Sequence, residues 1–267
     1  MYDKTFFYKK FMNNYFYKIW LPFHAIFIAS TLLVFINAIE INWVILCVSW
    51  FLIGPVGIGI GFHRLFSHRQ FKTWRPIEIL LACLGTLAAY GPLLYWVTQH
   101  QYHHKHTDTD KDINDPKKGF WHSFLYWRLT KNAENFILLK DKNSLLIAKD
   151  KIFVWLSKYF ISIIYLFALT SLLFGPSIFI SMFVFPIFIE HFRINILNSL
   201  AHLNIPGSYK NFSHNDNSQN NFILGIITFG FGWHNNHHAN PGELINTHKW
   251  WELDIEGQLA KLISKKS

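Results

Sequence analysis

Residues 42–68 read NWVILCVSWFLIGPVGIGIGFHRLFSH, and this stretch decides the fold that we expect. Its first part, residues 42–62, is predominantly apolar and matches the roughly 20 helical residues that a bilayer requires. The apolar run ends at His63 and His68, with Arg64 between them. The stretch therefore predicts a membrane-spanning helix that delivers two imidazoles to one membrane surface.

Three further apolar runs, residues 20–39, 152–174 and 177–197, are also long enough to span. A tight turn near Glu40 separates the first two of the four runs, and Gly175-Pro176 separates the last two. Each pair therefore predicts an antiparallel helical hairpin.

A fifth apolar run, residues 77–97, is interrupted by Gly85 and by Gly91-Pro92. These breaks favour an interfacial or re-entrant helix over a full span. If this run did span, the histidines before and after it would lie on opposite sides of the membrane.

Lysine and arginine indicate the sidedness. Of the 25 basic residues, 24 fall in segments 1–19, 63–75, 100–151 and 190–267, and only Lys158 does not. Short loops rich in Lys and Arg stay in the cytoplasm. We therefore expect an all-α integral membrane fold forming one domain over 1–267, with four transmembrane helices in two hairpins, the interfacial segment and a cytoplasmic helical cap. Both termini would be cytoplasmic, in a bacterial inner membrane or the endoplasmic reticulum.

The composition agrees with a lipid environment. The chain is 51% hydrophobic and 15% charged, whereas soluble domains carry about 25% charged residues. Its net charge of +9 comes from basic residues that follow the expected topology and form no basic face, so we exclude nucleic acid as a partner. The two cysteines, Cys47 and Cys83, form no C-x-x-C pair, so imidazoles must hold any metal.

Three histidine clusters lie on the expected cytoplasmic side. They are His63 and His68; His100, His103 and His104; and His234, His237 and His238. The last two clusters share the spacing i, i+3, i+4, which places their members on one helix face. Adjacent members such as His103 and His104 differ by about 100° around the helix and can therefore address two metal ions. A catalytic zinc ion is bound by about three protein ligands, and eight imidazoles are more than one such ion needs. We therefore expect a dinuclear site in the cap. Imidazole alone does not choose between Zn, Cu, Fe and Ni.

A polar stripe follows the last span, formed by His191, Asn195, Asn198 and His202. Polar groups at membrane depth are costly and usually functional. Asn198 and His202 are expected to belong to the site, whereas the deeper His191 is expected to hydrogen-bond within the bundle. The single histidines His24, His122, His214 and His248 are expected to be structural or exposed.

Acidic and basic residues flank the clusters. Asp108, Asp110, Asp112 and Asp115 follow the second cluster, and we select Asp108 and Asp112 as acceptors for imidazole N–H groups. A solvated loop is the alternative. Arg64, Arg69, Lys72 and Lys105 are candidate contacts for a substrate headgroup, with a solvated or lipid-facing role as the alternative.

These motifs resemble the three histidine boxes of the membrane fatty acid desaturases. Within that family, the sequence is most similar to the acyl-CoA Δ9-desaturase branch (stearoyl-CoA desaturase-like). The similar segments are HRLFSHR (63–69), NSLAH (198–202), GWHNNHH (232–238) and WWELD (250–254). The resemblance covers about residues 50–255.

The resemblance implies a di-iron centre held by nine histidines. By motif these correspond to His63, His68, His100, His103, His104, His202, His234, His237 and His238, with Asn198 close to one iron through water. The implied reaction uses O2 and two external electrons to insert a cis double bond, at Δ9, into a saturated acyl chain carried by CoA, a carrier protein or a membrane lipid. Because the chain ends soon after the third box, a separate electron donor of the ferredoxin, rubredoxin or cytochrome b5 type is expected.

Two other functions are open. A hydroxylase or ketolase uses the same boxes, and a metal-binding membrane transporter or sensor belongs to another class. A transporter predicts a path of ionisable residues through the spans, but His24, Lys158, Glu190 and His191 form no continuous path. The sequence also departs from the desaturase pattern at Phe231, where the family commonly has Glu, and at Gln99 and Gln101, where basic residues are common.

Overall fold

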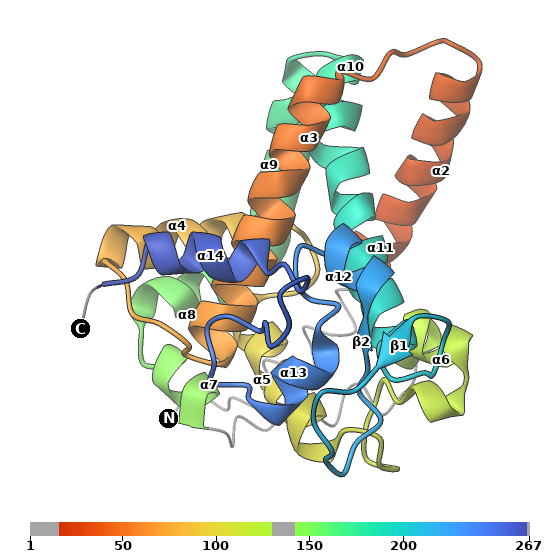
Figure 1. Ribbon diagram of the computed structural model, residues 1–267. Coiled ribbons are helices and arrows are strands. Elements are labelled where there is room, and N and C mark those ends of the chain that lie inside the picture. Colours follow the sequence, from red (N-terminus) through yellow and green to blue (C-terminus); the bar gives the residue numbers. More distant parts are fainter. Residues whose placement is uncertain (1–15, 130–141, 266–267) are drawn as a thin grey trace.

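The computed structural model describes residues 16–129 and 142–265. Upright helices form one end of the molecule, and shorter helices with long connections form the other (Figure 1). We call this second part the cap. The chain ends at 1–15 and 266–267, on which part of the expected sidedness depends, lie outside the described residues.

The upright part consists of paired helices. Its elements are η1 (Phe16–Trp20), α2 (Leu21–Phe35), α3 (Trp43–Phe51), η2 (Leu52–Ser67), α9 (Phe160–Leu173), α10 (Pro176–Phe179), η6 (Ile180–Val184) and α11 (Phe185–Leu200). Asn42 begins α3 because its side chain accepts a hydrogen bond from the Ile45 N–H at 3.1 Å. Its own N–H donates to Ser181 Oγ at 2.8 Å, which ties the two hairpins together.

Three described helical segments are long and apolar enough to cross a membrane, namely Lys18–Phe35, Trp43–Ser67 and Pro176–Leu200. A fourth span exists only if α8 (Lys151–Lys158) and α9 are counted together, because they meet at a bend of 67°. The apolar run predicted as a span over 152–174 is thus formed by two helices that meet at this bend. Contacts with distant residues hold α8 at this angle: the Phe153 ring packs 5.0 Å from the Phe66 ring, and Ser157 Oγ accepts a hydrogen bond from the Leu94 N–H.

The expected interfacial segment 77–97 is two helices. α4 (Arg75–Leu87) lies crosswise to the upright helices, and α5 (Leu93–His106) runs away from it into the cap (Figure 1). Gly85 does not break α4, whereas the connection holds Gly91 at φ +135°. Among the described residues, this segment forms no helix that qualifies as a span.

Glycines let η2 and α4 approach closely. A Cβ on Gly57 would lie 2.5 Å from the backbone nitrogen of Gly85, and one on Gly61 would lie 3.1 Å from the Leu81 Cβ. Pro55 inside η2 cannot donate a backbone hydrogen bond, and the surrounding turns are wide π-helical turns. The helix that carries His63 is thus packed directly on α4.

The cap is also helical. Its remaining elements are η3 (Pro116–Lys118), α6 (Phe120–Phe124), η4 (Tyr126–Leu129), α7 (Lys142–Ile147), α12 (Phe222–Ile227), α13 (His234–Ala239), α14 (Ile255–Leu262), β1 (Ser208–Tyr209) and β2 (Asn220–Asn221). The two short strands pair antiparallel, with Ser208 opposite Asn221. Asp254 begins α14 by accepting the Gly257 N–H at 2.8 Å. Apart from this two-stranded pair, the part of the chain that the structure describes is helical, as expected.

Candidate metal centre

Histidines from four distant segments meet in the cap as two groups. The ring nitrogens in each group lie within 4.8 Å of one another. The first, which we call the five-histidine group, contains His63, His68, His100, His104 and His237. The second, the four-histidine group, contains His103, His202, His234 and His238. The nine histidines selected from the sequence are therefore all brought together, and they divide into two sets.

Neighbouring histidines on one helix separate between the groups. His103 and His104 on α5 belong to different groups, and so do His237 and His238 on α13. This is the geometry expected from the rotation of about 100° between adjacent helical residues. Each of the two box helices therefore serves both groups.

The imidazoles in each group face one another through Nε2. In the five-histidine group, the Nε2 atoms of His68 and His100 are 2.7 Å apart, and those of His63 and His237 are 3.1 Å apart. In the four-histidine group, His202 Nε2 lies 3.0 Å from His234 Nε2. His238 Nε2 is buried without a hydrogen-bond partner. Converging nitrogens and an orphaned ring nitrogen fit a donor set for two metal ions.

The two asparagines inside the third box hold its helix in place. Asn235 accepts the backbone N–H groups of Asn211 and Phe212, each at 2.9 Å. Asn236 donates to the Asn246 carbonyl and to Glu252 Oε2, both at 2.9 Å. The histidines of α13 therefore face the two histidine groups, while Asn235 and Asn236 bind the helix to the surrounding loops.

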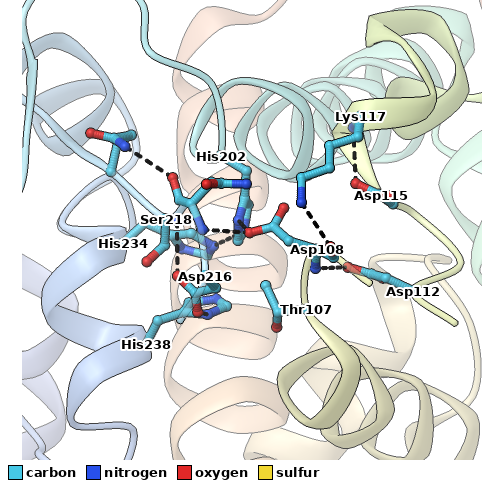
Figure 2. Close-up of polar contacts among 12 residues, drawn as sticks. Thr107, Asp108, Asp112, Asp115, Lys117, His202, Asp216, Ser218, His234 and His238 are labelled. Carbon is cyan, nitrogen blue, oxygen red and sulfur yellow. Dashed lines mark hydrogen bonds and ion pairs between the residues drawn. The ribbon is translucent and has the colours of Figure 1, made fainter. Parts of the chain in front are cut away.

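Carboxylates hydrogen-bond the far side of three imidazoles. His103 Nδ1 donates to Asp112 at 3.1 Å. His202 Nδ1 donates to Asp108 at 3.2 Å (Figure 2). These are the two acidic residues selected from the sequence. His238 Nδ1 donates to Asp216 at 2.8 Å. Such bonds fix the tautomer that leaves Nε2 free to bind a metal.

Burial keeps most of these rings neutral. Desolvation, with the neighbouring imidazoles, holds the pKa of His100, His104 and His237 well below the usual range. Burial also lowers the pKa of His68 to about 3. Burial lowers the pKa of His103 as well, but the adjacent Asp112 outweighs it and the net pKa is raised. Neutral imidazole is the form that binds metals.

Both groups border one narrow cavity of about 40 Å³. Its walls include His100 and His237 from the first group and His103 and His234 from the second. The remaining lining residues are His63, Trp96, Ile194, Leu197, Asn198, Phe231 and Asn246. A small apolar group in this cavity would therefore contact both sets of histidines, with Asn198 beside it.

The candidate headgroup residues lie elsewhere. Arg64 is fully buried and its Nη2 donates to both oxygens of Asp254, at 2.7 and 2.9 Å. The prediction that Arg64 contacts a substrate headgroup was therefore wrong, because a buried guanidinium that is paired with a carboxylate is not available to a headgroup. Arg69 and Lys72 are exposed and line a larger cavity of about 320 Å³ that none of the nine histidines borders. Lys105 is exposed on α5.

The polar stripe of α11 is partly structural. His191 is buried and its Nε2 donates to the Ala88 carbonyl at 3.0 Å, and Asn195 accepts the Tyr90 hydroxyl at 2.6 Å. His202 lies two residues beyond the end of α11, yet its ring turns into the four-histidine group.

Sequence reasoning missed Asp216 and the role of His214, which contacts Asp216 at 3.1 Å. Both lie in the polar stretch NFSHNDNSQNN (211–221), which has no periodicity to mark them. The only available signal was the position of this stretch between His202 and the third box.

The fold and site define a helical membrane protein with a histidine-rich metal-type centre. Residues 41–257 match the fatty acid desaturase family. The chain is 34% identical over 215 residues to an sn-1 stearoyl-lipid 9-desaturase from Anabaena variabilis, covering 80% of this chain and 77% of that protein. It is 35% identical over 208 residues to an sn-2 palmitoyl-lipid 9-desaturase from Nostoc sp. (strain 36), covering 76% and 72%. It is 31% identical over 238 residues to a probable acyl-CoA desaturase from Schizosaccharomyces pombe, covering 83% and 47%. The chain therefore belongs to the fatty acid desaturase family, whose members are oxidoreductases.

Proposed function

We propose that this protein is an O2-dependent di-iron desaturase that inserts a cis double bond at Δ9 into a saturated fatty acyl chain. The observation that carries the proposal is the narrow cavity bordered by both histidine groups. Two adjacent methylenes held there would each lie beside the donor set. The named activities of the relatives, several of them 9-desaturases, support the position of the double bond.

The nine histidines would hold two iron ions, five histidines on one and four on the other, with Asn198 close to one iron through water. Bound iron with O2 supplies the oxidant that an unactivated C–H bond requires. The protein itself orients the acyl chain and excludes water from the site. Ile194 and Leu197 on α11, with Phe231, give the cavity apolar walls that position an acyl chain.

The membrane arrangement that we propose has four spans in two hairpins, with α8 and α9 as one bent span. The single domain would place both histidine groups on the cytoplasmic side, in a bacterial inner membrane or the endoplasmic reticulum. Electrons would come from a separate donor of the ferredoxin, rubredoxin or cytochrome b5 type. A glycosylation tag at position 110 that becomes modified would contradict this sidedness.

The acyl carrier is proposed to be a membrane lipid, because the first relatives named above act on lipid-linked chains. The exposed Arg69, Lys72 and Lys105 are the candidate contacts for its phosphate. Purified enzyme given a stearoyl phospholipid or stearoyl-CoA, with a reducing system, separates the two carriers. Turnover of stearoyl-CoA alone would reject the lipid assignment.

Expression in a desaturase-deficient host tests the function. We expect monounsaturated fatty acids with the double bond at carbon 9, located by mass spectrometry of dimethyl disulfide adducts, and about two irons per purified chain. The His103→Ala variant should be inactive, whereas His248→Ala, which alters a histidine outside both groups, should retain activity. Hydroxylated products without unsaturated ones would instead identify a hydroxylase or ketolase. Bound metal with no lipid product would favour a transporter or sensor.

A further inference from the structure

The two histidine groups differ in the charges that surround them. In the four-histidine group, His103, His202 and His238 each donate to a separate carboxylate. The fourth member, His234, hydrogen-bonds the backbone of Phe231. Every ring in this group therefore has an acceptor behind it, and three of the four acceptors are carboxylates, belonging to Asp108, Asp112 and Asp216.

The five-histidine group has no such support among residues 16–129 and 142–265. The Nδ1 atoms of His63 and His237 are buried without hydrogen-bond partners. No described carboxylate forms a hydrogen bond or ion pair with any of the five rings. Its surroundings are aromatic instead: Trp96 stacks on His100 at 4.9 Å, and the Phe231 ring meets His63 at 4.6 Å.

The three carboxylates are themselves held in place. Asp216 accepts His214 Nδ1 at 3.1 Å and the Ser218 N–H at 2.9 Å in addition to His238. Asp108 also accepts the Asn217 N–H, and Asp112 accepts the N–H of Asp108 at 3.2 Å (Figure 2). The acidic side chains are thus fixed behind the rings, as Figure 2 shows for Asp108 and Asp216.

A carboxylate behind an imidazole raises the basicity of the ring and adds negative charge near the metal. Both effects favour the more oxidised state of a bound ion. We infer that Asp108, Asp112 and Asp216 make the two iron sites inequivalent, so that the four-histidine site holds the ferric ion when the centre carries one ferric and one ferrous iron. This inference rests on the proposed di-iron function.

Potentiometric titration of purified, 57Fe-enriched protein, followed by Mössbauer spectroscopy, tests the inference. We expect two separate one-electron reduction waves, one for each iron, with the four-histidine site reduced at the lower potential. Asp216→Asn keeps the shape of the side chain and removes its charge, and it should raise only the lower wave. Loss of the hydrogen-bond acceptor behind a metal-binding histidine lowers metal affinity roughly tenfold or more. A tenfold change in the ferric-to-ferrous ratio corresponds to about 59 mV for one electron.

Asp110→Asn is the matched control, because Asp110 is exposed on the same loop as Asp108 and its side chain makes no described contact with the nine histidines. It should leave both waves in place. One unresolved two-iron wave, a shift of the upper wave in Asp216→Asn, or an equal shift in Asp110→Asn would overturn the inference while leaving the di-iron proposal intact. Protein that binds no iron would overturn the proposed function, and the inference with it.

Discussion

The buried pair between Arg64 and Asp254 allows a quantitative test of how the first histidine box is held. Arg64 lies between His63 and His68 in sequence, and its side chain and that of Asp254 are both 0% exposed. Its Nη2 donates to both carboxylate oxygens at 2.7 and 2.9 Å, and its Nη1 donates to the Leu244 carbonyl at 2.5 Å. Asp254→Asn preserves the shape and the helix cap but leaves a buried cation without a counter-ion.

Removing one partner of a buried ion pair costs about 3–5 kcal/mol. For a chain of this size, about 1 kcal/mol shifts the melting temperature by about 2–4 °C. We therefore expect Asp254→Asn to lower the melting temperature in detergent by about 6–20 °C, measured by thermal unfolding with size-exclusion detection. The double variant Arg64→Met, Asp254→Asn should recover much of the loss, because no buried charge is left unpaired.

The control is an exposed pair of the same chemistry. Arg75 and Asp150 lie 2.7 Å apart, but their side chains are 42% and 26% exposed. Exposed pairs contribute about 0–1 kcal/mol, so Arg75→Met should shift the melting temperature by at most about 4 °C. If Asp254→Asn melts within about 2 °C of the unaltered protein, or no lower than Arg75→Met, the reasoning from burial is wrong.

Three further outcomes follow from the structure. His103→Ala and His237→Ala remove ligands from different groups. Each should lower the iron content from about two to about one per chain and abolish desaturation without loss of membrane insertion. Iron analysis and carbonate extraction check this, and full activity in either variant would contradict the ligand assignment. Burial raises the pKa of Glu256 to about 8, so the folded protein binds a proton that the unfolded chain releases above about pH 4.5. The free energy of unfolding should therefore fall as the pH rises from about 4.5 to about 8, and Glu256→Gln should flatten that slope in melting curves. Gly57→Ala places a Cβ 2.5 Å from a backbone nitrogen and should cost about 1–3 kcal/mol, whereas Gly242→Ala, with open space around it, should melt like the unaltered protein.

The histidine boxes were predictable because their geometry is local. The spacing i, i+3, i+4 fixes which rings share a helix face, and adjacent rings diverge by about 100° whatever the rest of the fold does. The assignment of His103 and His104 to different groups therefore follows from their sequence positions alone. The apolar runs that form α2 and α3 are local signals of the same kind.

Other features depend on contacts between distant residues and left no local signal. The bend between α8 and α9 is set by the packing of Phe153 and Ser157 against the cap. Arg64 meets Asp254 across 190 positions, so its sequence neighbours suggested an exposed basic residue instead. Asp216 reaches His238 from a loop of Asn, Ser and Asp residues in which any acidic or amide side chain looked equally solvated.

In the candidate centre, imidazoles form the inner layer and the described carboxylates lie behind them. In the proposed centre, neutral rings leave the metal charge uncompensated, and buried charge is costly without nearby counter-charges. The compensation lies one hydrogen bond further out, at carboxylates in the cap loops. On the opposite side, Ile194 and Leu197 of α11 line the cavity without charge. Carboxylates placed in the cavity wall would face the apolar path of an acyl chain, where their desolvation would be greatest. No described carboxylate lines this cavity, although both histidine groups border it, so the acidic residues stay behind the rings and the substrate side stays apolar.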